Sequence, residues 1–170
     1  GETRRDRLMP ENLRWLIEEG YPDRKIIVWA HNAHVMNAYY EAPTFKTISL
    51  EPIPDAMKTM GVHLAEWLGD DVYTIGITAY EGNDEMIGQP DTAKSIPPAP
   101  EGSVEERLHR LGYAQAFLDL RAARGEADHP LRGLQTMRVP KYDNVQITAP
   151  SQRYDAIFYI ARMEPATVIP

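Results

Sequence analysis

The sequence predicts an α/β domain in which helices flank a largely parallel sheet. Segments with the period of an amphipathic helix alternate along the chain with short apolar runs rich in β-branched residues, which is the pattern of a layered α/β fold. The 170 residues, of which 43% are hydrophobic, are enough for one domain with its own core. Four expected strands and three expected helices are few for this length, so we expect the domain to be part of a larger fold.

Three segments have helical character. Residues 1–20 place apolar side chains at helical spacing, and residues 54–68 carry one apolar stripe that ends at a glycine. Residues 103–112 begin with Ser103 followed three positions later by Glu106, which is the capping box of a helix N-terminus. We therefore expect helices over these three ranges.

Four segments have strand character. Residues 26–30 form a continuous apolar run without polar alternation, as in a strand buried on both faces, and we expect a strand over 25–30. The range 72–79 is rich in β-branched residues and predicts a second strand, and we expect two more strands over the largely apolar ranges 114–120 and 154–161. Residues 88–102 contain four prolines, and we expect an irregular crossing there.

Composition excludes several classes of function. The net charge of −7 argues against a nucleic-acid-binding surface, and no apolar run approaches the roughly 20 residues of a membrane span. The absence of cysteine removes disulfides, thiolate metal sites and a cysteine nucleophile. We expect no nucleic-acid partner, no membrane partner and a cytoplasmic location.

The candidate site follows the first expected strand. His31, Asn32 and His34 come directly after the apolar run, and ligands of open α/β sheets bind beyond the carboxyl ends of the strands. Tyr80 and Glu81 follow the second strand, and they reach the same edge if the two strands are parallel. The residues from 35 to 52 form a long aromatic segment, which is either a substrate lid or a cover for a sheet edge.

The histidine pair permits three interpretations. Two histidines at this spacing can bind zinc when a helix holds them on one face, but no third ligand is fixed by spacing. They can instead move protons or donate to an oxyanion, or they can be structural. The serine elbow Gly-x-Ser-x-Gly and the glycine-rich nucleotide loops are absent, so a directly activated water is the remaining route to hydrolysis.

Several motifs occur in the order found in the erythromycin esterase family, whose members include succinoglycan-biosynthesis-like proteins. The specific element is Trp-Ala-His-Asn-x-His at 29–34. The supporting elements are Arg5-Asp6-x-x-Met9-x-x-Asn12, Met60-Gly61-x-x-Leu64, Tyr80-Glu81-Gly82, Gly102-Ser103-x-Glu105, Leu118-Asp119-Leu120 and Tyr154-Asp155-Ala156. The chain therefore resembles this family over nearly its whole length.

The resemblance implies metal-independent hydrolysis of a carboxylic ester, such as a macrolide lactone, with no cofactor. His31 and His34 match a histidine pair in the family's active-site cleft. Asn32, Arg5, Glu81 and Tyr80 are then expected to contact or support a small-molecule ester substrate.

The resemblance covers only the C-terminal portion of the family. The family's N-terminal half carries a Gly-Glu-x-x-His-Gly motif, whose histidine is regarded as the base that activates water. Here Gly1-Glu2-Thr3 matches only its first residues, and Arg5 stands at the position of the histidine. We therefore expect a missing N-terminal half as partner and little activity from this chain alone. A ligand-binding domain of the same ancestry and a metal-dependent hydrolase are the alternatives.

Overall fold

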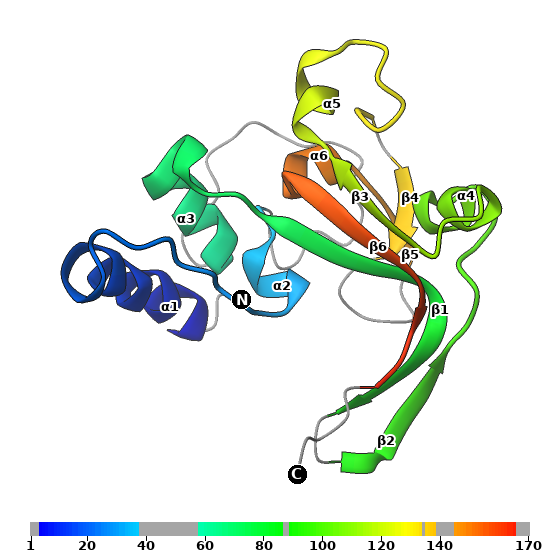
Figure 1. The fold of residues 1–170 in the computed structure, drawn as a ribbon, viewed down its shortest axis with the longest axis horizontal. Helices are drawn as coiled ribbons and strands as arrows, with labels where there is room; N and C mark the ends of the chain where they lie inside the picture. Colours follow the sequence, from blue (N-terminus) through cyan, green and yellow to red (C-terminus); the bar gives the residue numbers. More distant parts are fainter. Residues whose placement is uncertain (1–3, 38–57, 87–88, 134, 139–144, 166–170) are drawn as a thin grey trace.

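A computed structural model describes residues 4–37, 58–86, 89–133, 135–138 and 145–165, and it confirms the α/β class (Figure 1). The helices are α1 (Arg4–Trp15), α2 (Asn32–Val35), α3 (Met60–Leu68), α4 (Val104–Arg110), α5 (Arg121–Gly125) and α6 (Pro150–Arg153). A π-helical turn (Leu16–Gly20) and a 3₁₀ turn (Gly69–Asp71) extend α1 and α3. The strands are β1 (Ile75–Met86), β2 (Gln89–Ile96), β3 (Gln115–Asp119), β4 (Gln135–Arg138), β5 (Val145–Thr148) and β6 (Ala156–Met163).

The four-stranded sheet has the order β2-β1-β6-β3, and β4 and β5 form a separate two-stranded sheet. Among the described strands, only β1 and β6 are parallel, with Ile77 opposite Phe158; the β1–β2 and β3–β6 pairs are antiparallel. The expected parallel arrangement thus holds for one pair, and the sheet is mostly antiparallel. A reason is visible at β1 and β2, because strands joined by so short a connection can pair only in the antiparallel sense.

The prediction of an irregular crossing at 88–102 was wrong over its first half, where β2 forms. Figure 1 shows β1 and β2 as a long curved hairpin that extends away from the helices. Pro90 is compatible with this strand because β2 lies at the edge of the sheet, where a residue without a backbone N–H is tolerated.

The prediction of a buried strand at 25–30 was also wrong. This segment has no regular secondary structure, and the side chains of Ile27 and Trp29 are 91% and 86% exposed. An isolated extended segment gains no ladder hydrogen bonds, so an apolar composition alone does not make it a strand. Within the described residues, only Ile26 and Ala30 of this run pack against the core around α1 and α3.

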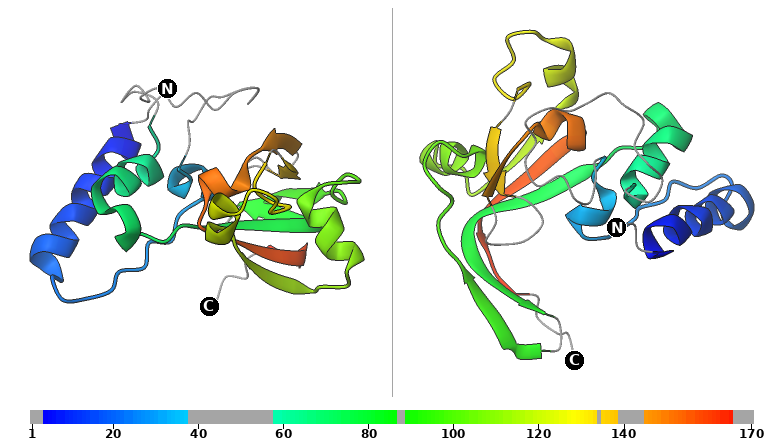
Figure 2. Two further views of the ribbon diagram at one scale, coloured as in Figure 1. Left: turned by 90° about the horizontal axis from the view of Figure 1, so that it is seen from above. Right: turned by 180° about the vertical axis from the view of Figure 1, so that it is seen from behind.

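Two apolar cores hold the structure together. Leu13 of α1 packs against Met60 and Leu64 of α3, and Figure 2 shows these two helices side by side and apart from the sheet. The second core lies under the sheet beside α4 and α6, and its buried members are Met36, Val104, Leu120, Met137, Tyr154 and Ile157. The expected helix at 103–112 is confirmed, and Ser103 Oγ accepts the Glu106 N–H at 3.1 Å as the capping box requires.

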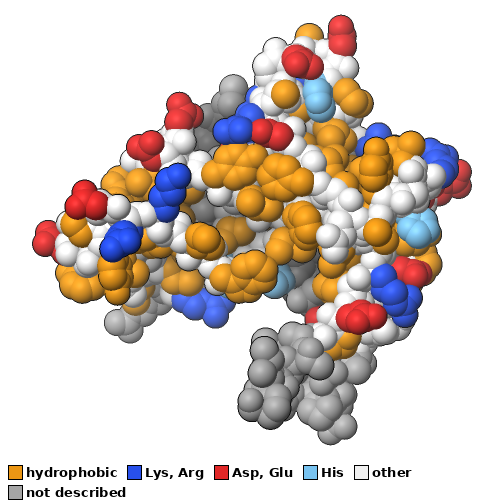
Figure 3. Space-filling model, in the orientation of Figure 1, with side chains coloured by type: hydrophobic (Ala, Val, Ile, Leu, Met, Phe, Trp, Pro, Cys, Tyr) orange, Lys and Arg blue, Asp and Glu red, His pale blue; other side chains and the backbone are white. Residues whose placement is uncertain are grey.

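The opposite face of the sheet carries exposed apolar side chains. Ile75 and Ile77 of β1 are 43% and 37% exposed, and Phe117 of β3 is 55% exposed. Figure 3 shows apolar side chains gathered across the middle of the molecule, over the region of these strands. Because burial of such surface is favourable, this face is suited to packing against further protein.

The proposed lid at 35–52 falls almost wholly outside the described residues, as do the first residues of the helix expected at 54–68. None of the helices in the described ranges combines the length and the apolar character that spanning a bilayer requires.

Candidate active site

The short helix α2 carries His34 and is capped by His31, and three anchors fix its position. The first is Asn32, which binds both backbone groups of Ile77 in β1. Its Nδ2 donates to the carbonyl oxygen at 2.6 Å, and its Oδ1 accepts the N–H at 3.0 Å. Asn32 therefore occupies the open edge of β1 much as a neighbouring strand would. Its predicted contact with substrate stays a prediction.

The other two anchors tie α2 to α3. The Thr59 hydroxyl donates to the carbonyl oxygen of Met36 at 2.6 Å and also caps α3 by accepting the N–H of Val62. Gly61 lies so close to α2 that an added Cβ would stand 2.0 Å from the carbonyl oxygen of Val35. The Met60-Gly61 pair thus has a packing function, because only glycine permits this approach of the two backbones.

His31 precedes α2 and caps it. Its Nδ1 accepts the N–H of Ala33 at 3.2 Å, and the residue is exposed. Neutral imidazole has one donor and one acceptor nitrogen, so neutral His31 carries its proton on Nε2. A ring N–H of this kind can donate a hydrogen bond to a carbonyl oxygen.

His34 is in a different environment. It is buried, and its Nδ1 lies 2.7 Å from Oδ1 of Asp6, a residue of α1 with 0% exposure. Its Nε2 lies 2.5 Å from the guanidinium of Arg5, in the same turn of α1. The rings of His31 and His34 are 6.5 Å apart between centroids. The structure therefore brings three of the predicted residues together, namely His31, His34 and Arg5.

Tyr80 and Glu81 make their described contacts elsewhere. The Tyr80 ring stacks on His109 of α4 with a centroid separation of 3.8 Å. Glu81 forms an ion pair with Arg162 of β6 at 3.0 Å. Adjacent residues of a strand point to opposite faces, so these two side chains cannot both face the histidines from a regular β1. Their expected contacts with substrate also stay predictions.

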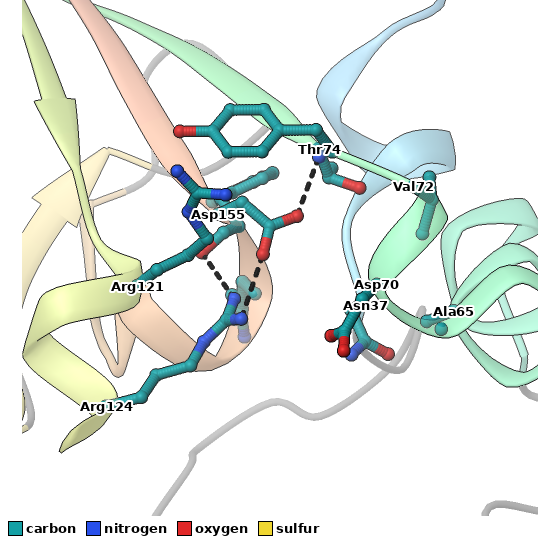
Figure 4. A pocket seen from close by; sticks show the side chains of 12 residues that line it. Asn37, Ala65, Asp70, Val72, Thr74, Arg121, Arg124 and Asp155 are labelled. Atoms are coloured by element: carbon teal, nitrogen blue, oxygen red, sulfur yellow. Dashed lines mark hydrogen bonds and ion pairs between the residues drawn. The ribbon is translucent and has the colours of Figure 1, made fainter.

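A cavity of about 320 Å³ lies between α3 and the α5–α6 region (Figure 4). None of the six site residues predicted from the sequence lines it. Figure 4 shows Arg124 and Asp155 on one side of it, joined at 2.8 Å. Arg124 also donates to the carbonyl oxygens of Ser151 and Tyr154, so its guanidinium serves the local fold. Burial lowers the pKa of Arg153, which lines the same cavity. Because Arg124 and Asp155 in this cavity already bind each other and Arg124 also binds the backbone, we place the candidate site at α2 instead.

Among the described residues, no group of three or more His, Asp or Glu side chains is arranged to hold a metal ion. The described geometry of α2 also differs from a metal site, because the two ring nitrogens of His34 face a carboxylate and a guanidinium.

Asp6 is the site residue that the sequence did not single out. Charged residues near the start of a helix are common, and Asp6 was noted only as part of the Arg5-Asp6 motif. Its contact with His34 spans 28 positions of sequence, so it depends on how α1 and α2 both pack against α3. The signal that could have found it was its place beside Arg5 in a motif that also contains the histidines.

The fold and this site together define an α/β domain with a polar histidine–arginine cluster at the open edge of its sheet, in a sequence that has no cysteine and no Gly-x-Ser-x-Gly elbow. The family model described as erythromycin esterase matches residues 1–163, and the chain belongs to this family.

Two relatives and one solved structure illustrate the similarity. The chain is 29% identical over 176 residues to YbfO of Bacillus subtilis (strain 168), a protein provisionally named a hydrolase, and covers 36% of it. It is 25% identical over 174 residues to erythromycin esterase type II of Escherichia coli and covers 38% of it. In both comparisons 97% of this chain is aligned. The crystal structure of a succinoglycan biosynthesis protein aligns with 94% of this chain and 38% of its own, with a TM-score of 0.67 and 23% identity. The chain thus spans well under half the length of these proteins.

Proposed function

We propose that this chain forms the histidine-bearing wall of an active site that hydrolyses a carboxylic ester, with a macrolide lactone as one candidate substrate. The observation that carries the proposal is that His34 of α2 contacts Arg5 of α1, with His31 at the cap of α2. His31 and Arg5 offer hydrogen-bond donors of the kind that stabilise a developing oxyanion, and the family is named for an esterase.

The chemistry follows from what each group can donate. A water oxygen attacks the acyl carbon, the carbonyl π electrons move to the carbonyl oxygen, and the ester C–O bond then breaks as that oxyanion collapses. His31 Nε2–H and the Arg5 guanidinium donate to the oxyanion. The proton lost by the water passes to a base and then to the departing alcohol oxygen. We assign the base to the part of the family fold that this chain does not cover.

The partner in this proposal is that remaining part of the family fold. The chain covers 36% and 38% of the two relatives described above, and it exposes Ile27, Trp29 and Phe117 at 91%, 86% and 55%. Covering these side chains would remove apolar surface from water, which favours association.

A cytoplasmic location also stays a prediction.

The test is hydrolysis of erythromycin and of p-nitrophenyl esters, with His31→Ala and His34→Ala as the site variants. His129→Ala is a matched control, because His129 Nδ1 accepts the N–H of Leu131 at 3.1 Å in the same local arrangement as His31 with Ala33. We expect little turnover by the 170 residues alone, and turnover that depends on His31 when the complementary half is supplied.

Three outcomes would change the proposal. Robust turnover by this chain alone, abolished by His31→Ala, would show that no further half is needed. Binding of the ester without turnover in the combined protein would favour the ligand-binding alternative. Turnover that a chelator abolishes would favour the metal-dependent alternative.

A further inference from the structure

We infer that Asp6 is a positioning residue, which fixes the ring proton of His34 on Nδ1 and thereby holds the Arg5 guanidinium in the site. This inference rests on the proposed function only for the use made of Arg5. The arrangement of the three side chains stands on the structure itself.

The first step concerns the protons of His34. A guanidinium has five N–H donors and no acceptor, so Nε2 of His34 must offer a lone pair to Arg5 across the 2.5 Å contact. The ring proton is then on Nδ1, where the Asp6 carboxylate accepts it at 2.7 Å. A doubly protonated ring would set an N–H of His34 against an N–H of Arg5. His34 is therefore neutral in this arrangement.

The second step concerns the carboxylate. Asp6 is fully buried, and a buried carboxylate is stable only with hydrogen bonds and a compensating charge. His34 supplies the hydrogen bond at one ring nitrogen, and its other nitrogen connects the carboxylate to the positive charge of Arg5. The imidazole thus links a buried anion to an exposed cation across α1 and α2.

The third step concerns what this linkage achieves. Arg5 is exposed, and a long side chain at a surface normally samples many rotamers. Attachment of one terminal nitrogen to His34 restricts it, so that other N–H groups of the guanidinium are presented in a defined direction. A planar guanidinium held in this way suits an oxyanion or a carboxylate. In the proposed reaction the ligand is the carbonyl oxygen of the ester, and His34 positions Arg5 instead of acting as the base.

The experiment is a long-range ¹H–¹⁵N spectrum of the histidine rings in the 170-residue protein, with His34→Gln used to assign the His34 signals. We expect wild-type His34 to show a protonated Nδ1 and an unprotonated Nε2 at neutral pH. Asp6→Leu introduces a side chain of similar shape that cannot accept a hydrogen bond. His34 should then no longer carry its ring proton on Nδ1 alone. Asp6→Asn should restore it in part, because the amide oxygen can accept the same proton. Asp119→Leu, which changes an exposed aspartate, is the control and should leave the His34 signals unchanged.

A second measurement follows Arg5 directly. The ¹⁵N relaxation of its guanidinium should report a rigid group in wild type and a mobile one in Asp6→Leu. A wild-type His34 that carries its proton on Nε2, or on both nitrogens, would overturn the inference without any variant. An Asp6→Leu protein that folds and keeps both the tautomer and the rigid Arg5 would also overturn it. Failure to detect esterase turnover would count against the proposed function and would leave these spectra unaffected.

Discussion

Replacement of Asn32 by alanine tests whether this side chain joins α2 to the sheet. The structure gives Asn32 two hydrogen bonds to Ile77, at 2.6 and 3.0 Å, and both are to backbone groups on the edge of β1 that does not face β6. Asn32→Ala removes both bonds and leaves the Ile77 groups to water. The variant should therefore be less stable, although its core packing is unchanged.

The magnitude follows from the two bonds. A neutral hydrogen bond contributes a net stability of about 0.5–1.5 kcal/mol, and the partial exposure of Asn32 favours the lower half of that range, so the loss should be about 1–2 kcal/mol. In a domain of this size such a loss corresponds to a fall in Tm of about 2–8 °C. With an m-value near 2 kcal/mol/M, the urea midpoint should fall by about 0.5–1 M.

The assay is urea unfolding followed by circular dichroism, with Asn12→Ala as the matched control. Asn12 is exposed on α1, and alanine there should be neutral or stabilise the helix by a few tenths of a kcal/mol. Asn32→Asp adds a sharper comparison, because its carboxylate can accept the Ile77 N–H but repels the Ile77 carbonyl oxygen. An Asn32→Ala protein with the wild-type urea midpoint would refute the reasoning. A raised KM for an ester with unchanged stability would instead assign Asn32 to the substrate.

Three further predictions concern stability. Gly61→Ala should destabilise the protein by about 1–3 kcal/mol or more in urea unfolding, because the new Cβ meets the backbone of α2, whereas Gly125→Ala, with open space around it, should not destabilise. Hydrogen bonds from Arg121 lower the pKa of Asp119 to about 2, so stability should fall as pH drops from about 4 to 2, and Asp119→Asn should lessen that fall in acid titrations. Burial raises the pKa of Tyr154 above its ordinary value of 10.0, so stability should fall as pH rises above 10, when the unfolded chain releases the proton first; Tyr154→Phe should reduce this alkaline loss. If Asp119→Asn lost as much stability in acid as the wild type, or Tyr154→Phe lost as much in alkali, the respective prediction would be contradicted.

Features fixed by local chemistry could be predicted from the sequence. The capping box of α4 depends on Ser103 and Glu106 alone, and the structure forms it, with Glu106 also accepting the N–H of Gly102 at 3.2 Å. The strands β3 and β6 and the helix α1 likewise appear where composition and period place them. For such elements, a few neighbouring residues carry most of the information.

Features that depend on distant parts of the chain could not be predicted. The run at 25–30 has the composition of a covered strand, but composition does not say what covers it, and within the described residues Trp29 stays 86% exposed. The contact of Asp6 with His34 joins two helices 28 positions apart, and no periodicity in the sequence reports it. The sequence therefore indicates His31, His34, Asn32 and Arg5, whereas the contact of Asp6 that orients His34 appears only in the packed structure.

The spacing of His31 and His34 separates their functions instead of uniting them. His31 lies at the cap, where its ring meets a backbone N–H and remains exposed, whereas His34, three residues later on a single helical turn, points into the contact with α1. A metal ion bound by both would need a lone pair on each ring, but the lone pair of His34 already faces the guanidinium of Arg5. Metal binding would therefore require displacement of Arg5 and would leave the positive charge of that side chain beside a cation. The geometry favours the interpretation in which His31 donates a proton or a hydrogen bond at the surface and His34 connects Asp6 to Arg5 beneath it.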